Sequence, residues 1–151
     1  MDEAAEDTNP ARTSTALPLE TSLALDGDGS RIAQARHVTT AFLEEVRDHG
    51  GIPVAQGTVE IAQLIVSELV TNARKYAPGP ALLHLRVHSA VLIVELWDSS
   101  PVVPAAQVPD PERVGQHGLE IVAALAQALT VEPTTVGKRI TAHITLATTS
   151  A

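Results

Sequence analysis

The sequence predicts an α+β fold, a two-layer sandwich in which helices cover one face of a mixed, mostly antiparallel sheet. Helix-like and strand-like segments follow one another in the order strand, helix, helix, strand, strand, loop, helix, strand, strand. The chain has 151 residues, enough for one domain with a hydrophobic core. Its hydrophobic residues, 44% of the chain, are mostly Ala, Val, Leu and Ile, so aliphatic side chains must fill that core.

The first predicted elements are a short edge strand and a helix. The strand covers residues 21–25 and ends at the Asp-Gly-Asp-Gly turn sequence of residues 26–29. Ser30 is a suitable N-cap for the helix, which ends at Gly50 and Gly51. The face of this helix that is expected to pack on the core consists of Ile32, Ala35, Val38, Thr39, Phe42 and Val46.

The second helix, predicted over residues 58–76, carries the most informative residues of the chain. Its apolar stripe, at i, i+3, i+4 spacing, consists of Ile61, Leu64, Ile65 and Leu69. Glu68 and Asn72 continue the line that Leu64 begins, so a carboxylate and a carboxamide are expected to point inward. Because a buried Glu needs a partner, the pair indicates a polar cavity; the alternative is the ordinary polar edge of an amphipathic helix.

Two strands and a long loop follow. Residues 83–87 alternate between apolar and polar, and a turn at residues 89–90 leads to a largely apolar, buried strand at 91–97 that ends in Asp98. Residues 99–117 contain four prolines and have no periodicity. Loops of this length are uncommon unless they are lids or binding segments, so a lid is predicted here.

A third helix and two strands complete the predicted fold. The helix is expected to face the core with Leu119, Val122, Leu125 and Leu129. The strands cover residues 129–132 and 139–146 and are separated by a turn at residues 133–138.

The net charge of −8 is concentrated near the N-terminus, where residues 1–28 contribute −6. This predicts a disordered acidic leader at residues 1–18, a folded domain at 19–147 and a short tail at 148–151. The bases of the domain are scattered rather than gathered on one face, which argues against direct binding of nucleic acid.

Composition excludes several further classes of function. The absence of cysteine excludes a disulfide framework, a thiolate nucleophile and a Cys-type zinc site. One Trp, one Tyr and one Phe are too few for base-stacking platforms. No run of eighteen apolar residues exists and the N-terminus is acidic, so we expect a cytoplasmic protein with no membrane segment.

Four motifs, in this order, resemble those of the Bergerat-fold (GHKL) ATP-binding superfamily of gyrase, Hsp90, histidine kinases and MutL. They are Glu68-Leu69-Val70-x-Asn72-Ala73, Asp98-Ser99-Ser100-Pro101, Gly115-x-x-Gly118-Leu119 and Gly137-Lys138. The resemblance extends over about residues 20–147. The single small domain, the Asp-x-Ser-Pro motif and the short lid are most similar to the anti-sigma-factor serine/threonine kinases of the RsbW and SpoIIAB type.

The resemblance implies that the chain binds ATP with Mg²⁺. Asn72 would ligate Mg²⁺, a hard cation that takes one or two protein oxygens beside water and phosphate oxygens. Glu68, one helical turn earlier on the same face, would be the general base that receives the proton of an attacking hydroxyl. Lys75 would reach a phosphate, although a lysine near a helix C-terminus is equally explained by the helix dipole.

The remaining motifs would hold the base and the phosphates. The resemblance implies that Asp98 accepts a hydrogen bond from the adenine amino group; the alternative is a solvated acid at a strand end. Gly115 and Gly118, followed by Leu119, would let backbone amides at the start of the third helix approach phosphate oxygens.

Some positions depart from the superfamily pattern. Ser99, Ser100 and Pro101 stand where relatives have glycines, which makes the loop on the adenine side stiffer. His117 separates the two glycines of the third motif. Many relatives have a Thr after the last glycine, where this chain has Lys138, so a water-bridged contact to adenine is expected to be missing.

Two function hypotheses of different class follow. The first is a protein kinase that phosphorylates a Ser or Thr of an anti-anti-sigma partner and sequesters a sigma factor, and a homodimer is one form considered for it. The second is a nucleotide-gated partner switch without phosphoryl transfer. A third alternative is the catalytic half of a split sensor kinase, which requires a separate protein that carries the phosphorylated His.

Overall fold

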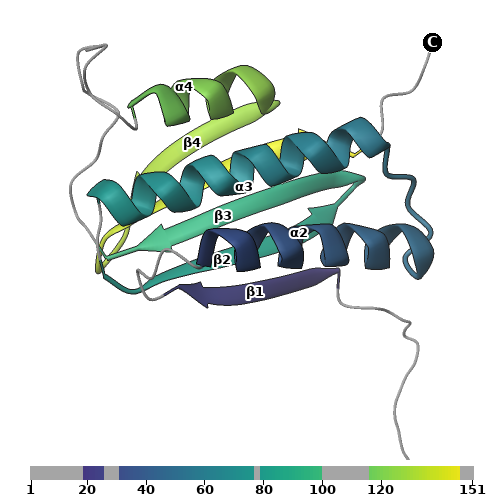
Figure 1. Cartoon of the computed structure of the whole chain (residues 1–151), viewed down its shortest axis with the longest axis horizontal. Coiled ribbons are helices and arrows are strands. Elements are labelled where there is room, and N and C mark those ends of the chain that lie inside the picture. Colours follow the sequence, from purple (N-terminus) through teal and green to yellow (C-terminus); the bar gives the residue numbers. More distant parts are fainter. Residues whose placement is uncertain (1–18, 26–30, 77–78, 100–115, 147–151) are drawn as a thin grey trace, which may run out of the picture.

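The computed structural model describes residues 19–25, 31–76, 79–99 and 116–146. Figure 1 shows that the helices of this part lie together on one face of a single twisted sheet. The elements, in chain order, are β1 (Glu20–Leu25), α2 (Arg31–Asp48), α3 (Gln56–Tyr76), β2 (Ala81–His88), β3 (Val91–Asp98), α4 (Gln116–Leu125), β4 (Ala128–Pro133) and β5 (Lys138–Thr145). The predicted two-layer α+β sandwich is confirmed.

The sheet is five-stranded, in the order β1-β2-β3-β5-β4, and every described pairing is antiparallel. The parallel pairing implied by a mixed sheet does not occur among these strands. The connection that follows β3 explains why only antiparallel pairs form. The chain passes through α4 to β4 at the far edge, and the β4–β5 hairpin then places β5 between β3 and β4.

The core lies between the helices and the inward-facing residues of the central strands. Leu92, Val94 and Leu96 of β3 alternate with side chains on the open face, and Ile140, Ala142 and Ile144 do the same in β5. Helix α2 buries Ala35, Thr39, Phe42, Leu43 and Val46, which agrees with the predicted face.

Helix α3 is rotated relative to the predicted stripe. Leu64 was expected in the core, but it is 42% exposed, whereas Ile65 and Leu69 are buried as predicted. A helix turns about 100° per residue, so each step of four residues advances about 40° around its axis. The line from Leu64 through Glu68 to Asn72 therefore winds from solvent into the core: Leu64 is exposed, Glu68 is half-buried and Asn72 is buried.

Helix α4 packs through fewer residues than predicted. Val122 is fully buried and Leu119 is packed against the core, but Leu125 is exposed. Leu129 does not extend the helical face, because α4 ends at Leu125 and Leu129 lies in β4, where it is partly buried.

The β2–β3 hairpin turns at the predicted residues. Ser89 and Ala90 have positive φ angles of 52° and 61°, the left-handed conformation that two-residue hairpin turns of type I′ require. The amide of Leu146 donates to the Ala90 carbonyl at 3.1 Å, which joins the end of β5 to this turn.

The predicted leader at 1–18 and the tail at 148–151 lie outside the described residues. So does most of the predicted lid at 99–117, except Ser99 at its start and residues 116 and 117, which belong to α4. Within the described part, no helix is long and apolar enough to cross a membrane.

Candidate functional site

The ends of several elements meet at one edge of the domain. Figure 1 shows α3 and β3 ending at this edge and α4 and β5 beginning there. The pairing register agrees, because Asp98, the last residue of β3, lies opposite Lys138, the first residue of β5. Residues from the first, second and fourth motifs are thus brought to one side of the molecule, although the motifs are far apart in the sequence.

Asp98 and Lys138 form a buried ion pair at this edge. The Lys138 ammonium lies 2.8 Å from a carboxylate oxygen of Asp98, and their side chains are only 2% and 1% exposed. An ammonium and a carboxylate are seldom so fully buried unless they are paired. Asp98 is therefore not a solvated acid at a strand end, which was the alternative that the sequence left open.

Strand alternation explains why both charges point inward. In β3 and β5, the residues two positions from the pair, Leu96 and Ile140, face the helices and are fully buried. Asp98 and Lys138 continue these two rows toward the edge. The turn before Lys138 is held by two hydrogen bonds, from the Gly137 amide to the Thr134 hydroxyl at 3.0 Å and from the Thr134 amide to the Gly137 carbonyl at 2.9 Å.

Asn72 and Glu68 approach this edge from α3. Asn72 lies in the last turns of the helix and is 4% exposed, so its carboxamide lies inside the domain rather than on its surface. Glu68 is half-buried one turn earlier. The sequence predicted that both would point inward, and the burial differs because the line that joins them winds around the helix.

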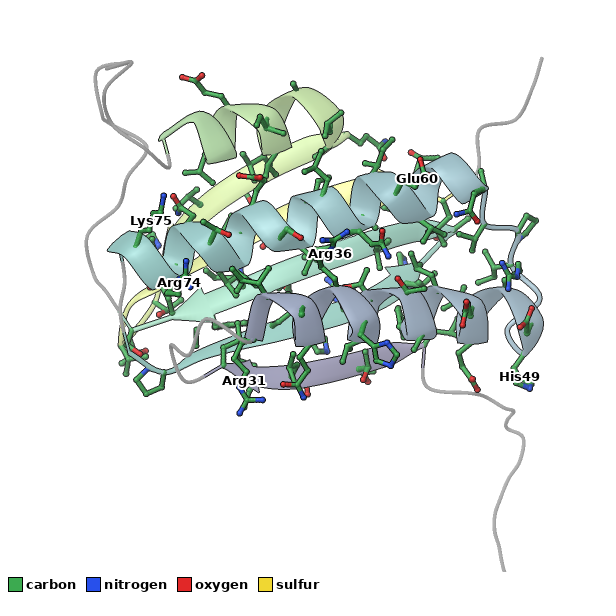
Figure 2. The ribbon with its side chains drawn as sticks, viewed as in Figure 1. Arg31, Arg36, His49, Glu60, Arg74 and Lys75 are labelled. Atoms are coloured by element: carbon green, nitrogen blue, oxygen red, sulfur yellow. The ribbon has the colours of Figure 1, made fainter. Side chains whose placement is uncertain are left out.

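Lys75 lies in the last turn of α3 and is exposed. Figure 2 shows Arg74 and Lys75 at the end of α3 that is close to the end of β3, with Glu60 at the opposite end. Two cations at the helix C-terminus complement its dipole. Lys75 thus lies at the same edge of the domain, and its side chain is exposed.

The third motif is described only in part. Gly118 lies in the first turn of α4, Leu119 packs against the core, and Gly115 lies outside the described residues. A helix N-terminus offers backbone N–H groups and the positive end of the helix dipole. Helix α4 contacts α3 and β5, so its first turn belongs to the same edge as Asn72 and Lys138.

Ser99 anchors the end of β3 to the neighbouring strand. Its hydroxyl donates to the Pro80 carbonyl at 2.6 Å, just before β2 begins. This contact holds the backbone directly after Asp98, and the rest of the predicted stiff loop lies outside the described residues.

Lys138 is the site residue whose partner sequence reasoning missed. The sequence indicates Lys138 only as a replacement for Thr and does not predict its contact with Asp98. The signal was present: the apolar alternation of Ile140, Ala142 and Ile144 extends backward to position 138, so its side chain had to face the core.

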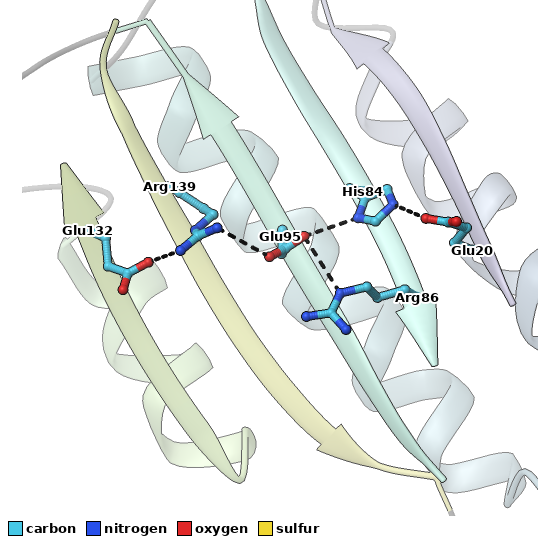
Figure 3. A network of polar contacts seen from close by, with 6 residues as sticks. All are labelled: Glu20, His84, Arg86, Glu95, Glu132 and Arg139. Atoms are coloured by element: carbon cyan, nitrogen blue, oxygen red, sulfur yellow. Dashed lines mark hydrogen bonds and ion pairs between the residues drawn. The ribbon is translucent and has the colours of Figure 1, made fainter. Parts of the chain in front are cut away.

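A second polar cluster occupies the open face of the sheet and is separate from this edge. Figure 3 shows it as a row across all five strands, with the helices behind the sheet. Its central residue, Glu95, lies 3.0 Å from His84, 3.8 Å from Arg139 and 4.0 Å from Arg86. His84 also contacts Glu20 at 2.9 Å, and Arg139 contacts Glu132.

Arg139 is held by its neighbours on this face. Its guanidinium lies 4.9 Å from the centre of the Trp97 ring, a cation–π distance. The hydrogen bond to Glu132 raises the pKa of Arg139 above its ordinary value. Lys138 and Arg139 are adjacent in sequence, yet they belong to opposite faces of the sheet because strand side chains alternate.

The described residues fit an adenine nucleotide with Mg²⁺. The buried edge offers a carboxylate acceptor at Asp98, beside the Lys138 ammonium, and the resemblance implies an acceptor there for the adenine amino group. Asn72 offers one buried amide oxygen. That is the small protein contribution that Mg²⁺ takes when phosphate oxygens complete its coordination.

Sequence comparison assigns no family, since neither a protein-family model nor a curated protein matches the chain. Solved structures do match it. The structure of the RsbU and RsbW domains of Rv1364c from Mycobacterium tuberculosis covers 87% of this chain with a TM-score of 0.60 and 16% identity. The blue-light activated histidine kinase domain from Erythrobacter litoralis EL346 covers 86% with a TM-score of 0.48 and 20% identity.

This chain spans 33% of the first structure's length and 62% of the second's. At 16% identity, the similarity to the first establishes a shared fold. The predicted resemblance to the Bergerat-fold superfamily agrees with that result, because the fold it implies is the one observed.

Proposed function

We propose that the chain is an ATP-binding regulatory protein that transfers phosphate to a Ser or Thr of a protein partner. The observation that supports this most strongly is the buried carboxylate of Asp98 at the end of β3, on the edge where α3 ends and α4 begins. The superfamily resemblance requires an acid for the adenine base at that position and an amide for Mg²⁺ on α3, where Asn72 is found.

Each described residue has a distinct role in this proposal. Asp98 accepts a hydrogen bond from the adenine amino group, Asn72 holds Mg²⁺ through its amide oxygen, and the backbone of the first turn of α4, at Gly118 and Leu119, faces phosphate oxygens. Glu68 receives the proton of the attacking hydroxyl. Bound Mg²⁺ would supply charge neutralisation on the phosphates. Lys75 adds an exposed cation near them, and Gly115, like Gly118, would let the backbone approach the phosphates.

The proposed partners are proteins. In the anti-sigma-factor kinases that the motifs resemble, the substrate is an anti-anti-sigma protein and the sequestered ligand is a sigma factor, often with a homodimeric kinase. A cytoplasmic location would follow from those partners. The RsbW domain named in the M. tuberculosis structure supports this version of the proposal over others.

The alternative function is a nucleotide-gated partner switch without phosphoryl transfer. One observation supports it. Glu68 is half-buried rather than held in a closed polar cavity, so the general base is less constrained than a transfer reaction favours. A split sensor kinase is a third candidate, distinguished by a phosphorylated His on another protein.

Labelled ATP, Mg²⁺ and candidate partner proteins test the proposal. We expect label on a Ser or Thr of an anti-anti-sigma-type partner, stable to acid. Acid-labile label on a His would indicate the split sensor kinase. A partner that is bound or released according to the nucleotide, without acquiring label, would replace the kinase with the switch.

A further inference from the structure

The Lys138 ammonium has more hydrogen-bond donors than the described residues use. An ammonium has three N–H donors and no acceptor. Among the residues that the structure describes, Asp98 is its one ion-pair partner, at 2.8 Å, and the side chain is 2% exposed. The described residues offer no hydrogen-bond acceptor for the other two donors.

A buried charge in this position calls for a further acceptor. Leaving buried donors of an ammonium unsatisfied is unfavourable, and a pair of this kind is often no more stable than apolar residues of similar volume. The row of β5 that Lys138 continues is otherwise Ile and Ala, so a Met or Leu would fit its packing. The packing of the core therefore does not require the charge or the N–H donors of Lys138.

We infer that Lys138 reads the nucleobase directly: its ammonium donates to the N1 ring nitrogen of adenine while Asp98 accepts from the adjacent 6-amino group. This rests on the proposed function, since it concerns the same nucleotide. Lys138 is then a specificity-determining residue rather than only the partner of Asp98.

The order of the two groups favours adenine over guanine. Adenine presents a donor at its 6-position and an acceptor at N1, which complement Asp98 and Lys138 in turn. Guanine in the same pose would place its O6 acceptor against the carboxylate and its N1–H donor against the ammonium. Both contacts would be mismatched, so the pair selects adenine.

Calorimetric titration of the full chain with ATP and 1-deaza-ATP tests this. The analogue replaces N1 with C–H and keeps the 6-amino group, so it removes only the acceptor for Lys138. We expect wild-type protein to bind 1-deaza-ATP roughly 10- to 100-fold more weakly than ATP, as for loss of a hydrogen bond to a charged group. The comparison uses wild-type protein and does not depend on the folding of a variant.

Two variants complete the experiment. Lys138→Met should bind ATP and 1-deaza-ATP equally, both near the affinity of wild type for the analogue. Arg139→Met is the matched control: it removes the same charge from the next residue of β5, on the opposite face, and should keep the wild-type ratio between the two ligands.

Three results would overturn the inference. Equal affinity of wild type for ATP and 1-deaza-ATP would remove the contact to N1. Tighter ATP binding by Lys138→Met would make the lysine a competitor of the base for Asp98. Stronger binding of GTP than ATP would assign the pair to guanine. Absence of any ATP binding would remove the proposed function as well, whereas equal binding of the two adenine ligands would remove this inference alone.

Discussion

Asp98 and Lys138 place opposite charges in two rows of side chains that are otherwise aliphatic. Both are almost completely buried, and they lie across the β3–β5 pairing from each other. Removing one partner of such a pair leaves an uncompensated buried charge, which is much more unfavourable than removing both. The effect of substituting one member of the pair on the free energy of unfolding can therefore be predicted without reference to any nucleotide.

Lys138→Met should lower the free energy of unfolding by about 3–5 kcal/mol, because Asp98 would remain buried without its cation. The double variant Asp98→Leu/Lys138→Met should recover most of this loss. Urea denaturation of Lys138→Met, Asp98→Leu and the double variant measures these changes in the free energy of unfolding. If the effects of the single variants simply added in the double variant, the two side chains would not be coupled.

Substitutions of Glu68 and Asn72 should impair different steps, phosphoryl transfer for Glu68 and Mg²⁺-dependent ATP binding for Asn72. Glu68→Gln should leave ATP affinity nearly unchanged and lower phosphoryl transfer by roughly 10²–10⁴-fold, because a general base acts on the attacking hydroxyl. Asn72→Ala should instead weaken ATP binding in Mg²⁺ and behave like wild type in a chelator. Titrations with and without Mg²⁺, together with a label-transfer assay, separate the two roles. A Glu68→Gln variant that loses nucleotide affinity would contradict the assignment.

At the residue scale, the sequence was sufficient to place Asn72 and Asp98. Both are polar residues inside strongly periodic apolar segments, and that conflict is visible without a structure. The Asp98–Lys138 contact was not predictable in the same way, because it depends on the register of two strands separated by 39 positions in sequence. The role of Gly115 stays a prediction, since that residue lies outside the described part.

Helix α3 shows how a correct element can carry an error in orientation. Its existence and its end at Tyr76 agree with prediction, but the buried side is centred on Ala62, Ile65, Val66 and Leu69. A stripe drawn through Leu64 is also apolar at helical spacing. The sequence pattern alone did not decide between the two, because contacts with the sheet and with α2 and α4 set the rotation of the helix.

Two leucines on α3 test that rotation. Leu69→Ala should lower the free energy of unfolding by about 2–5 kcal/mol, since it opens a cavity in the core. Leu64→Ala is the matched control and should lower it by less than about 1 kcal/mol, because its side chain already meets solvent. Chemical denaturation of the two variants checks the difference, and equal losses would mean that Leu64 is buried.

The β2–β3 turn carries strain that a substitution can relieve. Ala90 has a φ of 61°, a conformation that costs a residue with a Cβ about 1–2 kcal/mol. Ala90→Gly should therefore raise the free energy of unfolding by about 0.5–1 kcal/mol after the entropy of the unfolded glycine is included. Ala41→Gly, at an exposed position within α2, should have the opposite sign and a similar size. Thermal unfolding of the two variants would contradict this if both were destabilised.

At the element scale, prediction succeeded where the apolar periodicity extended over many residues and turn or capping residues marked the ends of the element. The hairpin at Ser89-Ala90, the edge strand β1 and the two long helices were all expected close to their observed bounds. The third helix was less well predicted. Its apolar spacing continued through Leu129, which belongs to β4, and a short helix followed at once by a strand offers little sequence signal for the boundary.

The whole molecule has two faces of different chemistry on one sheet. Among the described residues, the helix-covered face of the sheet is mainly apolar and carries Asp98 and Lys138 at its edge, and the open face carries the row of charges centred on Glu95. Strand alternation separates the two completely, as adjacent residues Lys138 and Arg139 show. The residues that we propose for the nucleotide site therefore lie at the edge of the covered face.

The fold itself tolerates large changes in sequence. It is shared with the M. tuberculosis RsbU/RsbW structure at 16% identity, because the order of elements and the placement of apolar rows determine it. The same tolerance means that fold alone does not define activity. In the proposed function, activity depends on a few residues at one edge, and these are what experiments must test.

Calorimetry with ATP, ADP and GTP, each with and without Mg²⁺, tests the central claim that this edge binds an adenine nucleotide. We predict that wild-type protein binds ATP and ADP, that GTP binds at least roughly tenfold more weakly, and that removing Mg²⁺ weakens ATP binding. Failure of every adenine nucleotide to bind at concentrations of about 1 mM would contradict the account, whatever the fold resembles.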